Sequence, residues 1–321
     1  MPLATTSTTS LTTPGDLTST MQIFYDKVFL ERAMQEMAYS YLTVKKTIPK
    51  NAGKTVYFTR YTPLAVVTAA ATEGTTPSAV NSTASTVSAT VGIYTNWEQV
   101  STFFELTSID SGLKELIEVH GQNAGESMDT VLGKVMTAGA TGQTAGAIAQ
   151  ITAMRSTDTL SVTEIKLALK TLKVNKAPKF EGGKYRAVIS TQGIWELQGD
   201  TAAGNWTNIG IYNSAENAKM LKDGVVGSLY GFDIKETNNQ ITVSIATTAS
   251  PITGYYSIFA GNHAVAEVDV AGSGTARTII KRAGANDTSN PVDMYMTVGW
   301  KVDAYTAKVL NANWIISLLH A

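Results

Sequence analysis

The sequence predicts an α+β protein that carries a long extended hairpin. Three observations predict this class: an uncharged stretch with strand-like ends in the first third, two helical segments with one apolar face each, and short alternating helix and strand patterns in the second half. Charged residues make up only 16% of the 321 residues, against roughly 25% in typical soluble domains. Much of the surface must therefore be neutral or covered by other chains.

The chain begins with a segment that has too little apolar surface to fold alone. Eleven of its first twenty residues are Ser or Thr, which predicts either a frayed terminus or an arm that becomes ordered on a neighbour. A helix is predicted from about Thr20 to Tyr41, because its apolar residues recur at helical spacing. That apolar face consists of Met21, Phe24, Tyr25, Val28 and Phe29.

The most informative segment is the stretch between Arg60 and Trp97, where Glu73 is the single charged residue. Its flanks, 55–61 and 87–94, are rich in β-branched and aromatic residues and predict the two strands of a hairpin. Sheet edges without charged residues are prone to aggregate unless they are always covered. We therefore expect another copy of the same protein to cover this hairpin.

Five residues are predicted to make contacts between subunits. Tyr57, Arg60 and Glu73 lie on the hairpin, and Phe24 and Tyr25 lie on the first helix. Aromatic and Arg residues are enriched at protein interfaces, which favours this prediction. For Phe24 and Tyr25, burial in the core of their own chain is an equally open interpretation.

A second long helix is predicted over 108–137, with an apolar face near heptad spacing. Four glycines within it each cost on the order of 1 kcal/mol relative to Ala. Such a helix needs support from the rest of the fold, and its glycines predict close approach of a neighbouring segment or a bend. The glycines are Gly112, Gly121, Gly125 and Gly133.

The rest of the chain predicts a mixed α/β region followed by strands. After a Gly-, Ala- and Thr-rich linker over 138–149, Ser161 and Glu164 have the spacing of a capping box that opens a helix. A core strand over 185–190 follows, and Gly and Pro residues separate the later elements. These are short helices over 194–197 and 213–222 and strands over 255–260, 264–270, 278–282 and 294–302.

Composition excludes several chemistries. The sequence has no Cys, which removes disulfides and thiolate catalysis. The net charge is −1, so no overall basic field indicates nucleic-acid binding. No signal-sequence pattern opens the chain and no apolar run has the length of a membrane span, so we expect a protein made in a cytoplasm that contacts no membrane.

No motif predicts an enzyme or a cofactor site. Gly53-Lys54-Thr55 ends like a phosphate-binding loop, but Ile48 stands where that motif requires its first glycine. His120, His263 and His320 are scattered and do not form a metal-ligand spacing.

Four tryptophans could suggest a stacking surface for single-stranded nucleic acid, but no basic residues are interleaved with them. Burial in the core or in a subunit interface is the better interpretation. These residues are Trp195, Trp206, Trp300 and Trp314.

Several segments together resemble the major capsid proteins of tailed bacteriophages, most closely the podovirus-like branch. They occur in the same order over essentially the whole chain. The segments are Phe24-Tyr25-Asp26-Lys27, Glu73-Gly74-Thr75-Thr76-Pro77, 223–234, Asn290-Pro291-Val292, Val298-Gly299-Trp300-Lys301 and 307–311.

The resemblance implies four structural parts. These would be an N-terminal arm and helix over 1–44, an extended β-hairpin loop over 45–100, a peripheral domain with a long spine helix and a β-sheet over 101–155 and 263–321, and an axial α/β domain over 156–262. It also implies hexamers and pentamers that form an icosahedral shell around packaged double-stranded DNA. The hairpin would then lie across an adjacent subunit.

The resemblance further implies partners and a location. The chain has no long, charged, helical N-terminal extension, so a separate scaffolding protein is expected, together with a portal at one vertex and decoration proteins. DNA contact would be weak and non-specific, and the protein would reside in the virion after assembly in the host cytoplasm. The alternatives are an encapsulin-like cargo compartment, then a secreted surface or adhesion protein suggested by the Thr-rich start, and then an enzyme.

Overall fold

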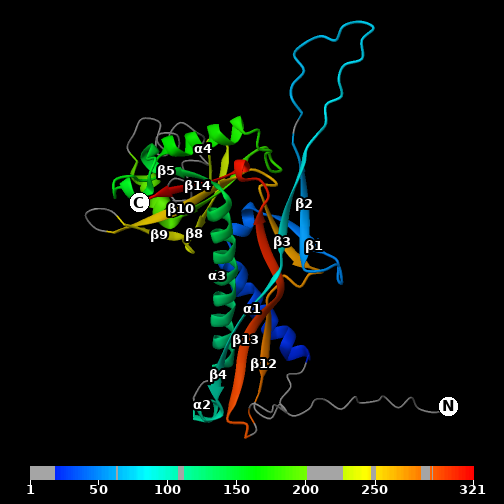
Figure 1. The fold of residues 1–321 in the computed structure, drawn as a ribbon. Helices are drawn as coiled ribbons and strands as arrows, with labels where there is room; N and C mark the ends of the chain where they lie inside the picture. The colour runs from blue at the N-terminus through cyan, green and yellow to red at the C-terminus, as the bar shows by residue number, and fades with distance from the viewer. Residues whose placement is uncertain are drawn as a thin grey trace, which may run out of the picture.

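The computed structural model describes residues 19–62, 64–107, 112–200, 227–246, 251–282, 290 and 292–321. It shows two β-sheets joined by a long helix, with a hairpin that extends well beyond them (Figure 1). The helices are α1 (Ser19–Glu36), η1 (Tyr39–Leu42), α2 (Thr102–Thr107), α3 (Leu113–Gly139), η2 (Ala145–Ala147), η3 (Ile151–Ala153), α4 (Val162–Val174), α5 (Thr191–Gly199) and η4 (Ala312–Trp314).

The strands fall into three sheets. The five-stranded sheet contains β1 (Val44–Ile48), β4 (Gly92–Ser101), β11 (Val265–Val270), β12 (Arg277–Lys281) and β13 (Tyr295–Val309). The seven-stranded sheet contains β5 (Thr141–Thr144), β6 (Tyr185–Ser190), β7 (Ser228–Leu229), β8 (Phe232–Thr237), β9 (Thr242–Ile245), β10 (Ile252–Ala260) and β14 (Ile315–His320). The hairpin consists of β2 (Thr55–Tyr61) and β3 (Ala84–Thr90).

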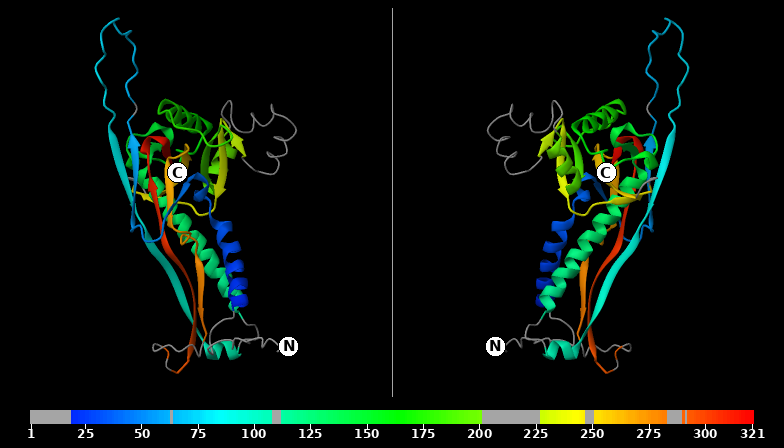
Figure 2. Two further views of the ribbon diagram at one scale, coloured as in Figure 1. Left: turned by 90° about the vertical axis from the view of Figure 1, so that its right-hand side faces the viewer. Right: turned by 90° about the vertical axis from the view of Figure 1, so that its left-hand side faces the viewer.

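Helices α1 and α3 cover one face of the five-stranded sheet (Figure 2). Val298, Trp300 and Val302 of β13 alternate along the strand and are buried in the core on this side. The Trp300 indole Nε1 donates to Asn123 Oδ1 on α3 at 3.0 Å, which satisfies the buried N–H. Among the described helices, α1 and α3 pack on this face and none covers the opposite one (Figure 2).

The glycines of α3 allow α1 to pack unusually close. A Cβ added at Gly121 would lie 2.7 Å from the Phe29 carbonyl oxygen, and one at Gly125 would lie 2.4 Å from that of Ala33. The helix continues through both glycines to Gly139 without a break. Close approach, one of the two predicted reasons for these glycines, is confirmed.

The seven-stranded sheet is covered on both faces. Helices α4 and α5 pack on one face around Ile189, Phe232 and Phe259, while α3 and η1 share a core with Val188 and Ile258 on the other. Strand β14 is buried along its whole length, as expected for a strand with apolar layers on both sides. Strands β5 and β14 come from ranges predicted to be peripheral, yet they pair within this sheet.

Asp129 of α3 fixes where the N-terminal segment leaves its helix. Its Oδ1 accepts hydrogen bonds from the backbone N–H groups of Ala38 at 2.9 Å and Tyr39 at 2.7 Å. The predicted helix to Tyr41 was wrong at its end: α1 stops at Glu36 and η1 begins at Tyr39. Burial raises the pKa of Asp129 to about 6, although these N–H donors and Asn239 lower it.

The predicted capping box is also wrong, although the helix α4 is present. The Ser161 side chain makes no capping bond. Glu164 turns instead toward the preceding loop, where its carboxylate accepts from Gln143 Nε2 at 3.0 Å and from the Gly146 N–H at 3.2 Å. The predicted helix over 213–222 lies outside the described residues.

Candidate subunit interface

The hairpin predicted from composition is present and extends far from the body of the protein (Figure 1). Seven residue pairs join β2 and β3, from Thr55 opposite Thr90 to Tyr61 opposite Ala84. One further bond, from the Thr62 N–H to the Thr83 carbonyl at 2.8 Å, closes this ladder. We call the residues from 55 to 90 the hairpin arm, and 62–83 its distal loop.

The root of the hairpin arm is packed on its own chain. Val56 and Phe58 of β2 and Ala89 of β3 share one face of the ribbon and contact Ile48 and Val268 of the five-stranded sheet. Val56 and Phe58 share this face because side chains on one face of a strand recur at every second position. Their packing against the five-stranded sheet fixes the angle at which the arm leaves the protein.

The distal part of the arm has no cover. Every described residue from 59 to 86 is exposed. Val66 is 81% and Val67 85% exposed, and Leu64 and Val80 are exposed as well. Exposed aliphatic side chains on uncharged, irregular backbone mark a surface that another molecule covers.

The structure separates the predicted contact residues of the hairpin arm. Tyr57 and Arg60 are both exposed but lie an odd number of residues apart on β2, so their side chains leave opposite faces of the ribbon. Glu73 is exposed in the distal loop, just before Gly74, which has a φ of +80°. Tyr61 is 68% exposed and shares a face with Tyr57.

The two predicted residues of α1 differ from each other. Phe24 is 53% exposed, whereas Tyr25 is partly buried and packs against the main core. Their rings meet edge to face with centroids 5.6 Å apart. Phe24 is therefore accessible to another chain, whereas Tyr25 packs between the Phe24 ring and the main core.

A second exposed surface lies on the uncovered face of the five-stranded sheet. The strand register places Ile279 of β12, Gly299 of β13 and Trp97 of β4 side by side on this face. Gly299 lets β4 approach closely, because a Cβ there would lie 2.6 Å from the Trp97 Cβ. Trp97 itself is 57% exposed. We call this surface the Trp97 groove.

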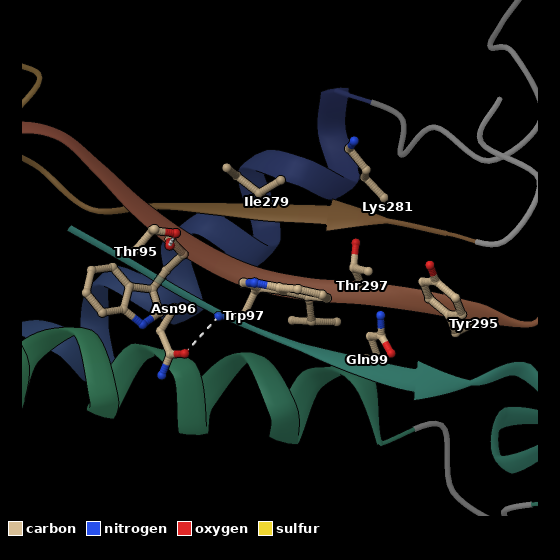
Figure 3. A pocket seen from close by; sticks show the side chains of 11 residues that line it. Thr95, Asn96, Trp97, Gln99, Ile279, Lys281, Tyr295 and Thr297 are labelled. Carbon is tan, nitrogen blue, oxygen red and sulfur yellow. Dashed lines mark hydrogen bonds between the residues drawn. The ribbon is translucent and has the colours of Figure 1, made fainter. Parts of the chain in front are cut away.

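The Trp97 groove encloses about 280 Å³ and is lined by three strands (Figure 3). Asn96 Oδ1 accepts from the Trp97 N–H at 3.0 Å and holds the backbone beside it. The rim of the Trp97 groove is polar and includes Thr95, Gln99 and Lys281, and Tyr295 closes one end of the groove. An apolar floor within a polar rim is the usual anatomy of a protein contact.

Sequence reasoning did not identify the Trp97 groove. The signal available was the alternation of Thr95, Trp97 and Gln99 along β4, which puts them on one face. Of the tryptophans that were considered, Trp300 is buried, Trp314 is partly buried and Trp195 is 69% exposed on α5. Trp206 lies outside the described residues.

One buried cluster has the residue types of a hydrolase triad but not its accessibility. His320 Nδ1 lies 2.8 Å from Glu196 Oε2, and its Nε2 lies 3.1 Å from the Ser257 hydroxyl and 3.4 Å from that of Ser190. Ser190 also accepts from the Gly193 N–H and caps α5. Because all four side chains are buried, no substrate reaches them, and the cluster ties β14 to α5.

Among the described residues, no group of His, Asp or Glu could hold a metal ion. His120 is buried on α3 with its Nε2 3.5 Å from Glu98, and His263 lies in the turn before β11. Within the same residues, no helix has both the length and the apolarity needed to span a membrane.

Comparison with solved structures identifies the fold. The chain matches a chain from the capsid of the cyanophage P-SCSP1u with a TM-score of 0.63 and 13% identity, covering 89% of this chain and 88% of that one. It matches a chain from the cyanophage Pam1 capsid with a TM-score of 0.60 and 14% identity, covering 100% and 98%. The fold of this protein is therefore the α+β fold of phage capsid proteins.

The same fold also relates the chain to a virus-like particle from Pyrococcus furiosus. That match has a TM-score of 0.50 and 10% identity, and covers 92% of this chain and 97% of that one. No protein-family model matches the chain, and no curated protein sequence matches it significantly.

Proposed function

We propose that this chain is the major capsid protein of a tailed bacteriophage, of the podovirus-like branch. It self-assembles as hexamers and pentamers into an icosahedral shell that encloses packaged double-stranded DNA. The role is structural and not enzymatic, and the protein resides in the virion. The observation that carries this proposal is the hairpin arm, whose distal aliphatic residues have no cover in their own chain, on a fold shared with phage capsids.

In this proposal the hairpin arm lies across the next subunit. Heterologous contacts of this kind generate closed rings when the rotation between copies closes. Burial of apolar and aromatic side chains supplies most of the affinity. Tyr57, Arg60, Glu73, Phe24 and Tyr25 are the proposed contact residues, and the Trp97 groove is an additional contact surface of the same assembly.

The proposed subunit has two larger domains. The axial domain, expected over 156–262, would contain α4, α5 and most strands of the seven-stranded sheet. The peripheral domain, expected over 101–155 and 263–321, would contain α3 as the spine helix and most of the five-stranded sheet, and it would lend β5 and β14 to the axial sheet. A separate scaffolding protein, a portal at one vertex and decoration proteins are the expected partners during and after assembly.

The experiment is sedimentation velocity and negative-stain electron microscopy of the purified protein, with co-expressed candidate scaffolding protein and without it. Closed shells of uniform size are expected. A homogeneous monomer under all these conditions would contradict the proposal.

An encapsulin-like cargo compartment is the second candidate. It is favoured by the likeness to the Pyrococcus furiosus particle, but that TM-score of 0.50 is below the 0.63 obtained with the P-SCSP1u capsid. Quantifying the contents of particles made in their native cells separates the two. Double-stranded DNA supports a phage head, and a packaged enzyme without DNA supports the compartment.

A further inference from the structure

Helix α4 carries a row of lysines on one side. Lys166, Lys170 and Lys173 are spaced i, i+4 and i+7, which places them on one helical face. Three more follow in the segment that leads to β6, so that six of the 25 basic residues of the chain fall within 166–184. We call these six the lysine stripe: Lys166, Lys170, Lys173, Lys176, Lys179 and Lys184.

The lysine stripe faces away from the protein. The opposite face of α4 is fully buried through Ile165, Ala168 and Leu172, which pack against the seven-stranded sheet. All six lysines are exposed, and α4 lies at an edge of the molecule (Figure 1, Figure 2). The packing of the helix therefore presents Lys166, Lys170 and Lys173 to a molecule that lies beside this edge.

Positive charge dominates the lysine stripe, since Glu181 is the single acidic residue between Lys166 and Lys184 in the sequence. In the part of the chain that the structure describes, none of the six ammonium groups forms an ion pair with a carboxylate. The acidic residue of α4, Glu164, is buried and bonds Gln143 and Gly146. Lys166 instead lies over the Tyr230 ring at 4.6 Å, and Lys184 donates to the Ser228 hydroxyl at 3.0 Å.

Such a concentration of like charge is costly for the helix and unusual for this chain. Like charges at i, i+4 disfavour a helix, and the chain as a whole has a net charge of −1 and only 16% charged residues. An external polyanion would offset the repulsion. A solvated face alone does not explain why the lysines gather here while the rest of the surface has so few charges.

The residue types favour a phosphate backbone over an acidic protein. Lysine is depleted in the cores of protein interfaces, whereas lysine contacts with phosphates supply most non-specific binding to nucleic acid. The segment 166–184 has no Arg or Gln to read base edges, and its Asn175 already donates to the Asn313 carbonyl at 2.9 Å. We propose that it binds the phosphate backbone of double-stranded DNA without sequence preference. This inference rests on the proposed function, in which the shell encloses DNA.

The test measures binding of a fluorescently labelled short random duplex to the full-length protein before assembly, by fluorescence anisotropy. It compares the unmodified protein with a stripe variant, Lys166→Gln, Lys170→Gln and Lys173→Gln. The control variant removes the same charge at three scattered exposed positions, Lys50→Gln, Lys134→Gln and Lys308→Gln. Thermal unfolding and particle formation are measured for all three proteins.

The stripe variant is expected to lose about tenfold or more of its DNA affinity at ~50 mM salt, while the control loses less than about twofold. The slope of log affinity against log salt should fall by about 2.7 in the stripe variant, since each phosphate contact contributes about 0.9. Unfolding and shell formation should be unchanged in both variants.

Three results would overturn the proposal. One is equal loss of DNA binding in the stripe and control variants, and another is tighter binding to polyglutamate than to DNA at the same salt. The third is a stripe variant that fails to assemble while it binds DNA normally, because the lysines would then contact another subunit. If none of the proteins forms shells but DNA binding depends on the stripe, only the proposed function is contradicted.

Discussion

Apolar side chains are buried in the seven-stranded sheet but exposed in the distal part of the hairpin arm. In the sheet, every residue of β14 is buried, and Phe232 and Phe259 meet edge to face at 5.0 Å between helices and strands of the same chain. In the hairpin arm, Val66 and Val67 are more than four-fifths exposed. The comparison indicates that the sheet stabilises the fold of one subunit, and it supports the proposal that the arm contacts other subunits.

Shortening the hairpin arm should have the largest effect on assembly. Residues 63–82 would be replaced by Asn-Gly, which favours the two-residue turn of a tight hairpin, so that Thr62 and Thr83 keep their hydrogen bond. Because the described residues of the distal loop are all exposed, the subunit should unfold at the same temperature, while shell formation should be lost. Differential scanning calorimetry and sedimentation velocity measure the two properties.

The control for this change keeps the length of the loop and replaces its exposed threonines with serines, which preserves its polarity. This control should assemble. Normal shells from the shortened protein would show that the hairpin arm is dispensable for subunit contacts.

Phe232→Ala should instead destabilise the unassembled subunit. The side chain is fully buried between Tyr185 and Phe259, and removing such a ring costs about 3–5 kcal/mol of unfolding free energy. Urea denaturation of the unassembled subunit measures this loss. Trp195→Ala, an exposed aromatic position on α5, serves as the control and should change stability by less than about 0.5 kcal/mol. Equal effects would contradict the assignment of the core.

Val66→Thr combined with Val67→Thr should weaken assembly without changing the subunit. Each substitution keeps the shape of the side chain but adds a hydroxyl to a surface that becomes buried, at a cost of about 1–3 kcal/mol if it finds no partner. The critical concentration for shell formation, measured by light scattering, should rise about tenfold or more. Val174→Thr, at an exposed position on α4, should leave it unchanged. An equal rise for both proteins would contradict the specific role of the arm.

The smallest expected effect is a pH dependence that comes from Asp129. Its folded pKa of about 6 exceeds the ordinary value of 3.8, so its protonation favours the folded state. This contribution is fully present below about pH 4 and is lost as pH rises through about 6. Asp129→Asn should flatten the stability profile between these values, as measured by urea unfolding at each pH. The exposed control Glu236→Gln should leave the slope of stability against pH unchanged. The same slope in Asp129→Asn would contradict the role given to Asp129.

Several elements of the fold were predictable from the sequence because local signals determine them. Strands β2, Thr55–Tyr61, and β6, Tyr185–Ser190, begin and end where β-branched or aromatic runs meet turn residues. The end of α1 and the missing capping box were not predictable in this way. Asp129 and Gln143 decide them, through contacts that no local pattern reveals.

Of the candidate interface, the hairpin arm was predictable from the sequence and the Trp97 groove was not. The hairpin arm could be recognised because the single charge between Arg60 and Trp97 is a property of one continuous segment. The Trp97 groove requires the register of three strands that bring Ile279 and Gly299 beside Trp97. A sequence pattern gives the outward face of each strand but not which strands are neighbours.

Cryo-electron microscopy of the purified, unfractionated protein tests the central claim most directly. The account predicts closed icosahedral shells in which the distal loop of each hairpin arm lies on an adjacent subunit and Val66 and Val67 are buried there. Monomers that remain dispersed in the presence of scaffolding protein, or shells in which the distal loop projects freely into solvent, would contradict it.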